Sequence, residues 1–334
     1  MNIAIRADGG SQIGMGHIMR TLTLAKNLRK NNDVFYVCRV DIPLTNKYSM
    51  GIKKIKEEGF NVVIINEENT ISELNNIKAD LLITDSYDVD ERYFFETKKI
   101  FKNTVYIDDL NLFYFDVDIL INPNITAVDF QYQVPNDTRL LLGTKYLMLR
   151  EEFRVEKAKE DREEIKDIMI TVGGGDPLNI TNKILEYIID LKINYHVVIG
   201  PAFDVEVIKK IESICKGRKN IKLYKNSNIV DVMKKCDLAI SACGSTIYEL
   251  CAINIPILGI ILADNQYKIG TKMHEKDLIY CLGWYYELKK ENIIGGINYY
   301  SDIKVRKKTR NDQSKIININ GVEEVSKEIM NLCR

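Results

Sequence analysis

Short apolar runs alternate with longer amphipathic stretches along this chain, and this alternation limits the possible folds more than any other feature. The runs in the first half are NIAIR, VFYVC, VVII, LLIT and TVYI. Between them, TLTLAKNLRK, KYSMGIKKIKEE and ERYFFETKKI carry apolar residues at helical spacing. Runs that are apolar throughout are typical of strands covered by helices on both faces, so the pattern predicts a parallel sheet.

The alternation restarts after residue 165, with the runs DIMITV, YHVVIG, NIKLY, DLAIS and IPILGI. We expect helices from residues 178, 204, 228, 245 and 265. The segment between the halves, REEFRVEKAKEDREEIKD (150–167), is highly charged and has no apolar stripe that could face a core. We therefore predict an α/β protein of two Rossmann-like domains facing a cleft, with a first domain at 1–150, a linker at 151–166 and a second domain at 167–334.

Composition excludes several classes of partner. Lys plus Arg equals Asp plus Glu at 47 each, so the formal net charge is zero. Nucleic-acid binding depends on a basic surface, and we expect no such partner. We interpret the basic cluster KVRKKTR (304–310) as a solvated face. The longest apolar stretch, residues 251–263, is too short to span a bilayer, and we interpret it as a helix end followed by a buried strand.

Cysteine and histidine usage gives the remaining expectations. The seven cysteines include no CxxC pair, which indicates reduced thiols and a cytoplasmic protein. The three histidines lack zinc-ligand spacing, so we predict no metal site and no cofactor. The N-terminus has no apolar run of the signal-peptide type. A monomer is the default expectation, because a cleft between two domains needs no second copy.

Both halves open with a strand, a glycine-bearing loop and a helix, in IAIRADGGSQIGMGH and IMITVGGGDPLNIT. Ligands bind such sheets at the carboxyl ends of the strands. In the first loop His17 follows Gly14 and Gly16 at an expected helix start, where the helix dipole favours a neutral ring. A neutral imidazole is what a general base needs, although a surface role at a helix terminus is the alternative for His17.

The second half carries a sharper signal in DLAISACGSTIYELCAINIPIL. Gly244, Ser245 and Thr246 open a helix whose free amides could hold a phosphate, and Glu249 follows within reach of ribose hydroxyls. The alternative is an ordinary Ser or Thr cap with a surface glutamate. Gly173 and Gly174 lie in a second glycine loop, whose backbone a ligand could approach closely, and we expect this loop at the same edge of the second sheet.

These strings resemble a known family. The strand–SxxGST–xxE helix is similar to the nucleotide-sugar site of GT-B glycosyltransferases of the MurG type. The string RADGGSQIGMGHIMR is closer to the PseG-type UDP-2,4-diacetamido-2,4,6-trideoxy-β-L-altropyranose hydrolases of pseudaminic acid synthesis and to the SpsG spore-coat proteins. Further similarities are TDSYDVD, VYIDDL, INPN, GTKYLMLREEF, ITVGGGD and DNQ.

The resemblance implies a metal-free, inverting hydrolysis of a UDP-sugar at its anomeric carbon. It implies that His17 is the general base and that Tyr87 and Asn265, with the neighbouring Gln266, line the sugar pocket. It assigns the UDP site to four residues of the second half: Gly244, Ser245, Thr246 and Glu249.

Several alternatives stay open from the residues themselves. A GT-B glycosyltransferase would use the same UDP site, with an acceptor hydroxyl in place of water. A non-catalytic nucleotide-sugar binding protein is the third possibility. The DVD strings at 88–90 and 116–118 could hold a metal, but no second ligand cluster accompanies them. Asp108 and Asp109 follow a strand, either as a cleft group or as a turn.

Overall fold

A computed structural model describes residues 1–154, 162–225 and 227–333. The chain consists of two compact units. Unit 1 contains Met1–Arg150 and Ile319–Arg334, and unit 2 contains Glu151–Asn318. The predicted boundary after residue 150 is thus also a boundary between the units, whereas residues 319–334 lie in unit 1 and were predicted in the second domain. The middle of the predicted linker, residues 155–161, lies outside the described residues.

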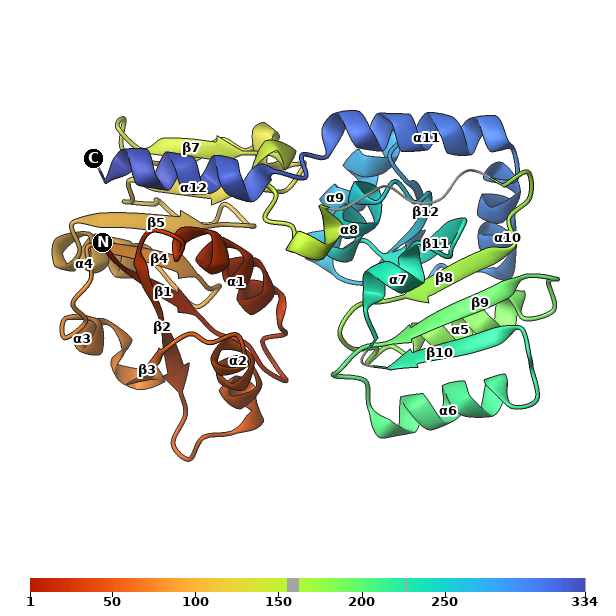
Figure 1. Cartoon of the computed structure of the whole chain (residues 1–334), viewed down its shortest axis with the longest axis horizontal. Helices are drawn as coiled ribbons and strands as arrows, with labels where there is room; N and C mark the ends of the chain where they lie inside the picture. Colours follow the sequence, from red (N-terminus) through yellow and green to blue (C-terminus); the bar gives the residue numbers. More distant parts are fainter. Residues whose placement is uncertain (155–161, 226, 334) are drawn as a thin grey trace. The chain divides into compact units, whose positions relative to one another are not determined.

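The helices and strands of unit 1 are β1 (Asn2–Ala7), α1 (Gly16–Leu28), β2 (Asp33–Val40), α2 (Asn46–Glu57), β3 (Val62–Asn66), α3 (Thr70–Leu74), β4 (Leu81–Asp85), α4 (Glu91–Ile100), β5 (Asn103–Ile107), β6 (Ile119–Asn122), β7 (Arg139–Leu142) and α12 (Gly321–Leu332). Its strands form one sheet in the order β3-β2-β1-β4-β5-β6-β7 (Figure 1). All pairs of neighbouring strands are parallel.

The central strands of unit 1 are buried on both faces, as their continuous apolar runs predict, whereas Val63 and Ile64 of the edge strand β3 are 38% and 48% exposed. Along β1, Ile3 and Ile5 belong to one core cluster and Ala4 to another. The first cluster is completed by residues of α1, α2 and α12, and the second by residues of α3 and α4. Helices therefore cover both faces of this sheet.

Helix α12 explains why residues 319–334 join unit 1. Val322, Val325 and Ile329 are fully buried in the same cluster as the residues of α1. The helix, blue in Figure 1, lies beside α1 although the two are far apart in sequence. Apolar periodicity predicts that such a helix is amphipathic, but it does not state which of two similar cores the helix covers.

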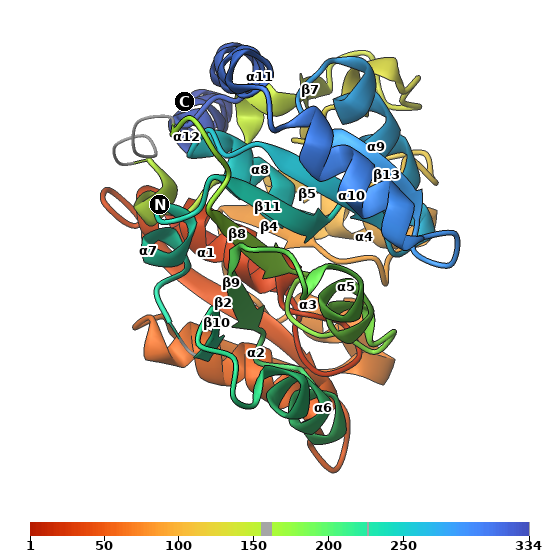
Figure 2. The ribbon, with the colours of Figure 1, turned by 90° about the vertical axis from the view of Figure 1, so that its right-hand side faces the viewer.

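The helices and strands of unit 2 are β8 (Asp167–Thr171), α5 (Ile180–Ile188), β9 (Asn194–Ile199), α6 (Val205–Cys215), β10 (Ile221–Lys225), α7 (Ile229–Met233), β11 (Leu238–Ala242), α8 (Thr246–Ala252), β12 (Ile257–Ile261), α9 (Asp264–Glu275), β13 (Tyr280–Trp284), α10 (Lys290–Tyr299) and α11 (Ile303–Ile316). Its parallel sheet has the order β10-β9-β8-β11-β12-β13. Figure 2 shows α5 and α6 side by side, and both contribute apolar side chains to the core cluster of this unit.

The basic cluster at 304–310 departs in part from the prediction of a solvated face. It lies on α11, but Arg306 is only 1% exposed. Its guanidinium donates to the backbone oxygens of Ser301 at 3.0 Å and of Arg162 at 2.6 Å. A buried guanidinium needs such acceptors, and the sequence pattern does not reveal them.

Candidate functional site in unit 1

The loop before α1 is closed by its own backbone. Gly10 and Gly14 exchange two hydrogen bonds, from the Gly10 amide at 3.0 Å and from the Gly14 amide at 2.8 Å. Gly14 has φ = 80°, a conformation that favours glycine. Gly16 then begins α1, and His17 lies in the first turn of that helix. The tight loop thus delivers His17 to the carboxyl edge of the sheet.

His17 pairs with the last residue of the neighbouring strand β4. Its Nδ1 lies 2.6 Å from Oδ1 of Asp85, and both side chains are buried. Burial acts to raise the pKa of Asp85, but the charge and hydrogen bonds of Arg20 and the contact with His17 outweigh it and lower that pKa. An ionised Asp85 accepts the Nδ1 proton, so the neutral ring carries its lone pair on Nε2. Among the described residues, Nε2 has no hydrogen-bond partner.

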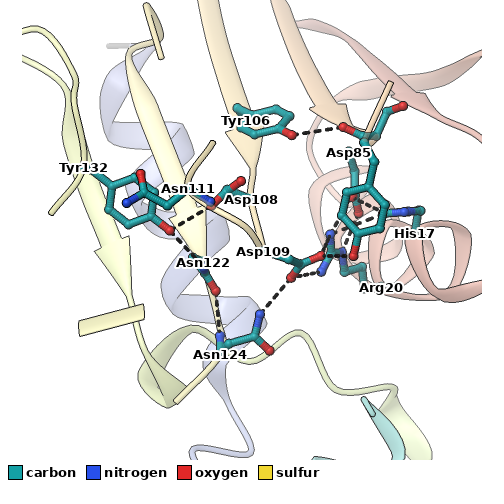
Figure 3. A network of polar contacts seen from close by, with 12 residues as sticks. His17, Arg20, Asp85, Tyr106, Asp108, Asp109, Asn111, Asn122, Asn124 and Tyr132 are labelled. Carbon is teal, nitrogen blue, oxygen red and sulfur yellow. Dashed lines mark hydrogen bonds and ion pairs between the residues drawn. The ribbon is translucent and has the colours of Figure 1, made fainter. Parts of the chain in front are cut away.

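Arg20 lies one turn after His17 on α1 and bridges two strands. Its Nε and Nη2 each lie 2.6 Å from an oxygen of Asp85. Its Nη1 and Nη2 also lie 2.8 and 2.9 Å from the two oxygens of Asp109, just beyond β5. One guanidinium therefore joins the carboxyl ends of β4 and β5 through paired, charge-assisted hydrogen bonds (Figure 3).

Asp109 also contacts the predicted sugar-pocket residue Tyr87. The Tyr87 hydroxyl donates to Oδ2 of Asp109 at 2.8 Å, and Nδ2 of Asn124 donates to Oδ1 at 2.8 Å. The Tyr87 ring lies edge-on to His17, with 4.6 Å between ring centroids. Burial acts to raise the pKa of Asp109, but Arg20 outweighs it and lowers this pKa to about 2. Asp109 is therefore an anion at neutral pH.

The neighbouring Asp108 has a different role. Its Oδ2 accepts hydrogen bonds from the Asn111 amide at 2.8 Å and from the Tyr132 hydroxyl at 2.9 Å. Burial raises the pKa of Asp108, and the adjacent Asp109 adds to the effect. The two aspartates therefore differ: Asp108 stabilises the turn after β5, whereas Asp109 belongs to the His17 network.

Three residues of this network were not assigned a role from the sequence, namely Arg20, Asp85 and Asn124, and Asp109 was left open between a cleft group and a turn. Each lies inside a string noted for its similarity to known families, namely RADGGSQIGMGHIMR, TDSYDVD, VYIDDL and INPN. Arg20 could have been found by its three-residue spacing from His17, which places both on one helix face. The others come together only because β4, β5 and β6 end at one edge of the sheet.

The first glycine loop of unit 2 is organised around a carboxylate. Gly173 and Gly174 follow β8, and the Gly174 oxygen accepts a hydrogen bond from the Ala202 amide at 2.8 Å, beyond β9. The buried Asp176 accepts from the amides of Ile180 and Thr181, each at 2.8 Å. Asp176 thus already occupies the start of α5, where an anionic ligand would otherwise be attracted.

At the start of α8, unlike at the start of α5, no described carboxylate accepts hydrogen bonds from the helix amides. No described residue accepts a hydrogen bond from the amides of Gly244, Ser245 or Thr246, and Ser245 makes no side-chain cap. The alternative of an ordinary serine cap is therefore not what the structure contains. Gln266 lies over this loop: its Nε2 is 3.7 Å from the position that a Cβ at Gly244 would take. Asn265 is exposed beside it at the start of α9.

Three of the four aspartates of the DVD strings have structural partners. Asp88 pairs with Arg39, Asp90 accepts from the Tyr93 amide at 2.7 Å and caps α4, and Asp118 pairs with Lys98. Within residues 1–154, 162–225 and 227–333, no group of three or more His, Cys, Asp or Glu side chains could hold a metal ion. The described helices include none that is both long and apolar enough to cross a bilayer.

Comparisons with known proteins place this geometry in context. No protein-family model matches the chain. It is 34% identical over 283 residues to the uncharacterised protein MJ1062 of Methanocaldococcus jannaschii, an alignment of 80% of this chain, which spans 56% of that relative. It is 28% identical to the UDP-2,4-diacetamido-2,4,6-trideoxy-β-L-altropyranose hydrolase of Campylobacter jejuni, covering 83% of this chain and 97% of that one. It is also 28% identical to the spore coat polysaccharide biosynthesis protein SpsG of Bacillus subtilis, covering 80% and 79%.

Solved structures show the fold. The MurG structure from Acinetobacter baumannii matches with a TM-score of 0.68 at 11% identity, covering 99% of both chains. The UDP complex of MnaA from S. aureus matches with a TM-score of 0.65 at 12% identity, covering 98% and 95%. The predicted fold class, α/β with two Rossmann-like sheets of the GT-B type, is confirmed, and so is the predicted homology to the hydrolase and SpsG proteins.

Proposed function

We propose that this protein hydrolyses a UDP-linked diacetamido-trideoxy sugar at the anomeric carbon and releases UDP and the free sugar. The observation that carries the proposal is the buried His17–Asp85 pair at the carboxyl edge of the unit 1 sheet, with Nε2 of His17 unpartnered among the described residues. The names of the Campylobacter hydrolase and of SpsG support the substrate class and a place in nonulosonate or surface-polysaccharide synthesis.

In the proposed reaction, Nε2 of His17 takes a proton from a water molecule as its oxygen bonds to the anomeric carbon. The bond between that carbon and the diphosphate oxygen breaks, and UDP leaves with the electron pair. Water attacks opposite the leaving group, so the configuration inverts. Asp85 holds the Nδ1 proton and stabilises the imidazolium that forms.

We assign the leaving diphosphate to the amides of Gly244, Ser245 and Thr246, which have no described acceptor. Amide donors and the helix dipole stabilise negative charge that develops on a departing group. Glu249 is assigned to the ribose, and Tyr87, Asn265 and Gln266 to the sugar. Gly173 and Gly174, in the loop after β8, are assigned to the substrate-binding edge of the unit 2 sheet. With a base and these donors present, the proposed reaction needs no metal ion.

The test is hydrolysis of UDP-2,4-diacetamido-2,4,6-trideoxy-β-L-altropyranose in ¹⁸O-labelled water, with products analysed by mass spectrometry. We expect UDP release without any acceptor, with the label in the free sugar and equal rates with and without EDTA. Attack at phosphorus would place the label in UDP and normally requires a divalent metal.

Each competing function has its own outcome in this assay. Release that requires an added acceptor alcohol indicates a glycosyltransferase. Binding of UDP without turnover indicates a nucleotide-sugar binding protein. Label in the nucleotide, or inhibition by EDTA, contradicts the role of His17 as a base against the anomeric carbon.

A further inference from the structure

Two contacts of the Tyr87 side chain, one of its ring and one of its hydroxyl, hold it in place. It lies on the loop after β4, 48% exposed, where no helix or strand fixes it. Its ring stands at 83° to the ring of His17 with 4.6 Å between centroids. Its hydroxyl donates to Oδ2 of Asp109 at 2.8 Å. A half-exposed tyrosine has free rotamers in water, so these two contacts select the position of the ring.

Asp109 is restrained on both oxygens. Oδ1 accepts from Nη1 of Arg20 at 2.8 Å and from Nδ2 of Asn124 at 2.8 Å. Oδ2 accepts from Nη2 of Arg20 at 2.9 Å and from the Tyr87 hydroxyl. Rotation of this carboxylate would break charge-assisted hydrogen bonds to an arginine that is itself held by Asp85. The restraint on Tyr87 therefore extends back to Arg20 on α1 and to Asp85 at the end of β4.

The same contacts set the charge around His17. Two carboxylates, Asp85 and Asp109, surround one guanidinium, Arg20, which leaves one net negative charge when His17 is neutral. In the proposed reaction, a net negative surrounding attracts the positive charge that develops on His17. Without Asp109, the remaining charges of Asp85 and Arg20 cancel.

We propose that Asp109 is a positioning residue for His17: it holds the Tyr87 ring against the imidazole and keeps the surrounding cluster anionic. Asp109 acts through Tyr87 and Arg20 and touches no reacting atom in this proposal. The geometric part stands independently of the substrate, whereas the kinetic part rests on the proposed function.

The chain contains a matched control next to this pair. The Tyr132 hydroxyl donates to Asp108 at 2.9 Å (Figure 3). In the same way, the Tyr87 hydroxyl donates to Asp109 at 2.8 Å. The Tyr132–Asp108 contact belongs to the turn after β5 and has no contact with the His17 ring among the described residues. Tyr132→Phe therefore removes the same kind of hydrogen bond to a neighbouring carboxylate, together with the hydrogen bond that the Tyr132 hydroxyl accepts from Nδ2 of Asn122 at 2.8 Å.

The first experiment needs no substrate. The chain contains three histidines, so the ring resonances of ¹³C,¹⁵N-histidine-labelled protein are few. The His17 resonances are assigned as those that disappear in the spectrum of His17→Asn. Asp109→Asn and Tyr87→Phe should both shift the His17 ring resonances and leave those of His196 and His274 in place. Tyr132→Phe should leave all three unchanged. Unshifted His17 resonances in a folded Asp109→Asn protein overturn the proposal.

The second experiment measures kcat and KM for UDP-2,4-diacetamido-2,4,6-trideoxy-β-L-altropyranose. Loss of a hydrogen bond to a charged group predicts a kcat lower by roughly tenfold or more in Asp109→Asn, with Tyr132→Phe at the wild-type rate. In Asp109→Asn/Tyr87→Phe the losses should be less than additive, because both changes break one unit. Fully additive losses contradict the proposal. Wild-type protein without turnover refutes the proposed function instead and leaves the resonance test valid.

Discussion

Two buried histidines in this chain, His17 and His196, each pair with an aspartate that also binds an arginine. They differ in the contacts of the second ring nitrogen and in the end of the strand at which the aspartate lies. In unit 1, His17 pairs with Asp85 at 2.6 Å, and Asp85 also binds Arg20. In unit 2, His196 pairs through Nε2 with Asp167 at 2.8 Å, and Asp167 also binds Arg162. A His–Asp–Arg set therefore does not by itself indicate a catalytic base.

The difference lies in the second ring nitrogen and in the end of the sheet. Nδ1 of His196 contacts the Tyr224 hydroxyl at 2.9 Å, so both of its nitrogens are occupied. Asp167 is the first residue of β8, whereas Asp85 is the last residue of β4. Ligands bind parallel sheets at carboxyl ends. The comparison assigns a structural role to His196, as its position inside a strand predicts, and leaves His17 as the candidate base.

The sharpest test of this comparison exchanges each histidine for asparagine. His17→Asn should lower turnover by about 10²–10⁴-fold and leave UDP binding near the wild-type value, because a positioned base contributes that factor. His196→Asn should instead destabilise unit 2 by about 1–3 kcal/mol through its unpaired partners, with little effect on kcat. Steady-state kinetics and thermal unfolding of both variants decide the matter. Equal losses of turnover in the two would remove the distinction.

A second test concerns the amides of unit 2, where we expect a smaller effect. In Gly244→Ala the new Cβ would lie 3.7 Å from Nε2 of Gln266, an ordinary contact, so the fold should tolerate it. The methyl group lies beside the proposed diphosphate amides and should weaken UDP binding on the order of tenfold by calorimetry. Gly295→Ala is the control, since a Cβ on that α10 residue meets nothing within 4 Å. Unchanged UDP affinity in Gly244→Ala would exclude this loop as the anion site.

The smallest expected effect is the pH dependence of stability in unit 1. Because the folded-state pKa of Asp109 is lowered to about 2, its ion pair stabilises the fold above the unfolded-state pKa of roughly 4. This contribution is lost as the pH falls from about 4 towards 2. The melting temperature of the wild type should therefore exceed that of Asp109→Asn at neutral pH, and the difference should shrink over this window. A difference that stays constant down to pH 2 would argue against an ionised, paired Asp109.

Much of the architecture could be predicted because its signal is local. The apolar runs correspond to β1–β5 and β8–β12, and helix starts expected at 178, 204, 228, 245 and 265 lie within two residues of those observed at 180, 205, 229, 246 and 264. The strands that escaped prediction have weaker signals. β6 and β7 are four residues long, and every residue of β13 is only partly buried. A strand of only four residues, or one that is only partly buried, has too short or too weak an apolar run to be distinguished from a loop in sequence.

The sequence by itself determined the two parallel sheets, the glycine loop before His17 and the glycine-bearing helix start at Gly244, because strand burial and backbone conformation depend on residues close together in the chain. Only the tertiary structure decided which carboxylates surround His17. Asp85 and Asp109 lie 68 and 89 positions from His17 and Arg20 respectively, on strands that became neighbours through crossovers. The placement of α12 in unit 1 was decided in the same way, since an amphipathic helix packs against whichever apolar surface the complete chain leaves uncovered.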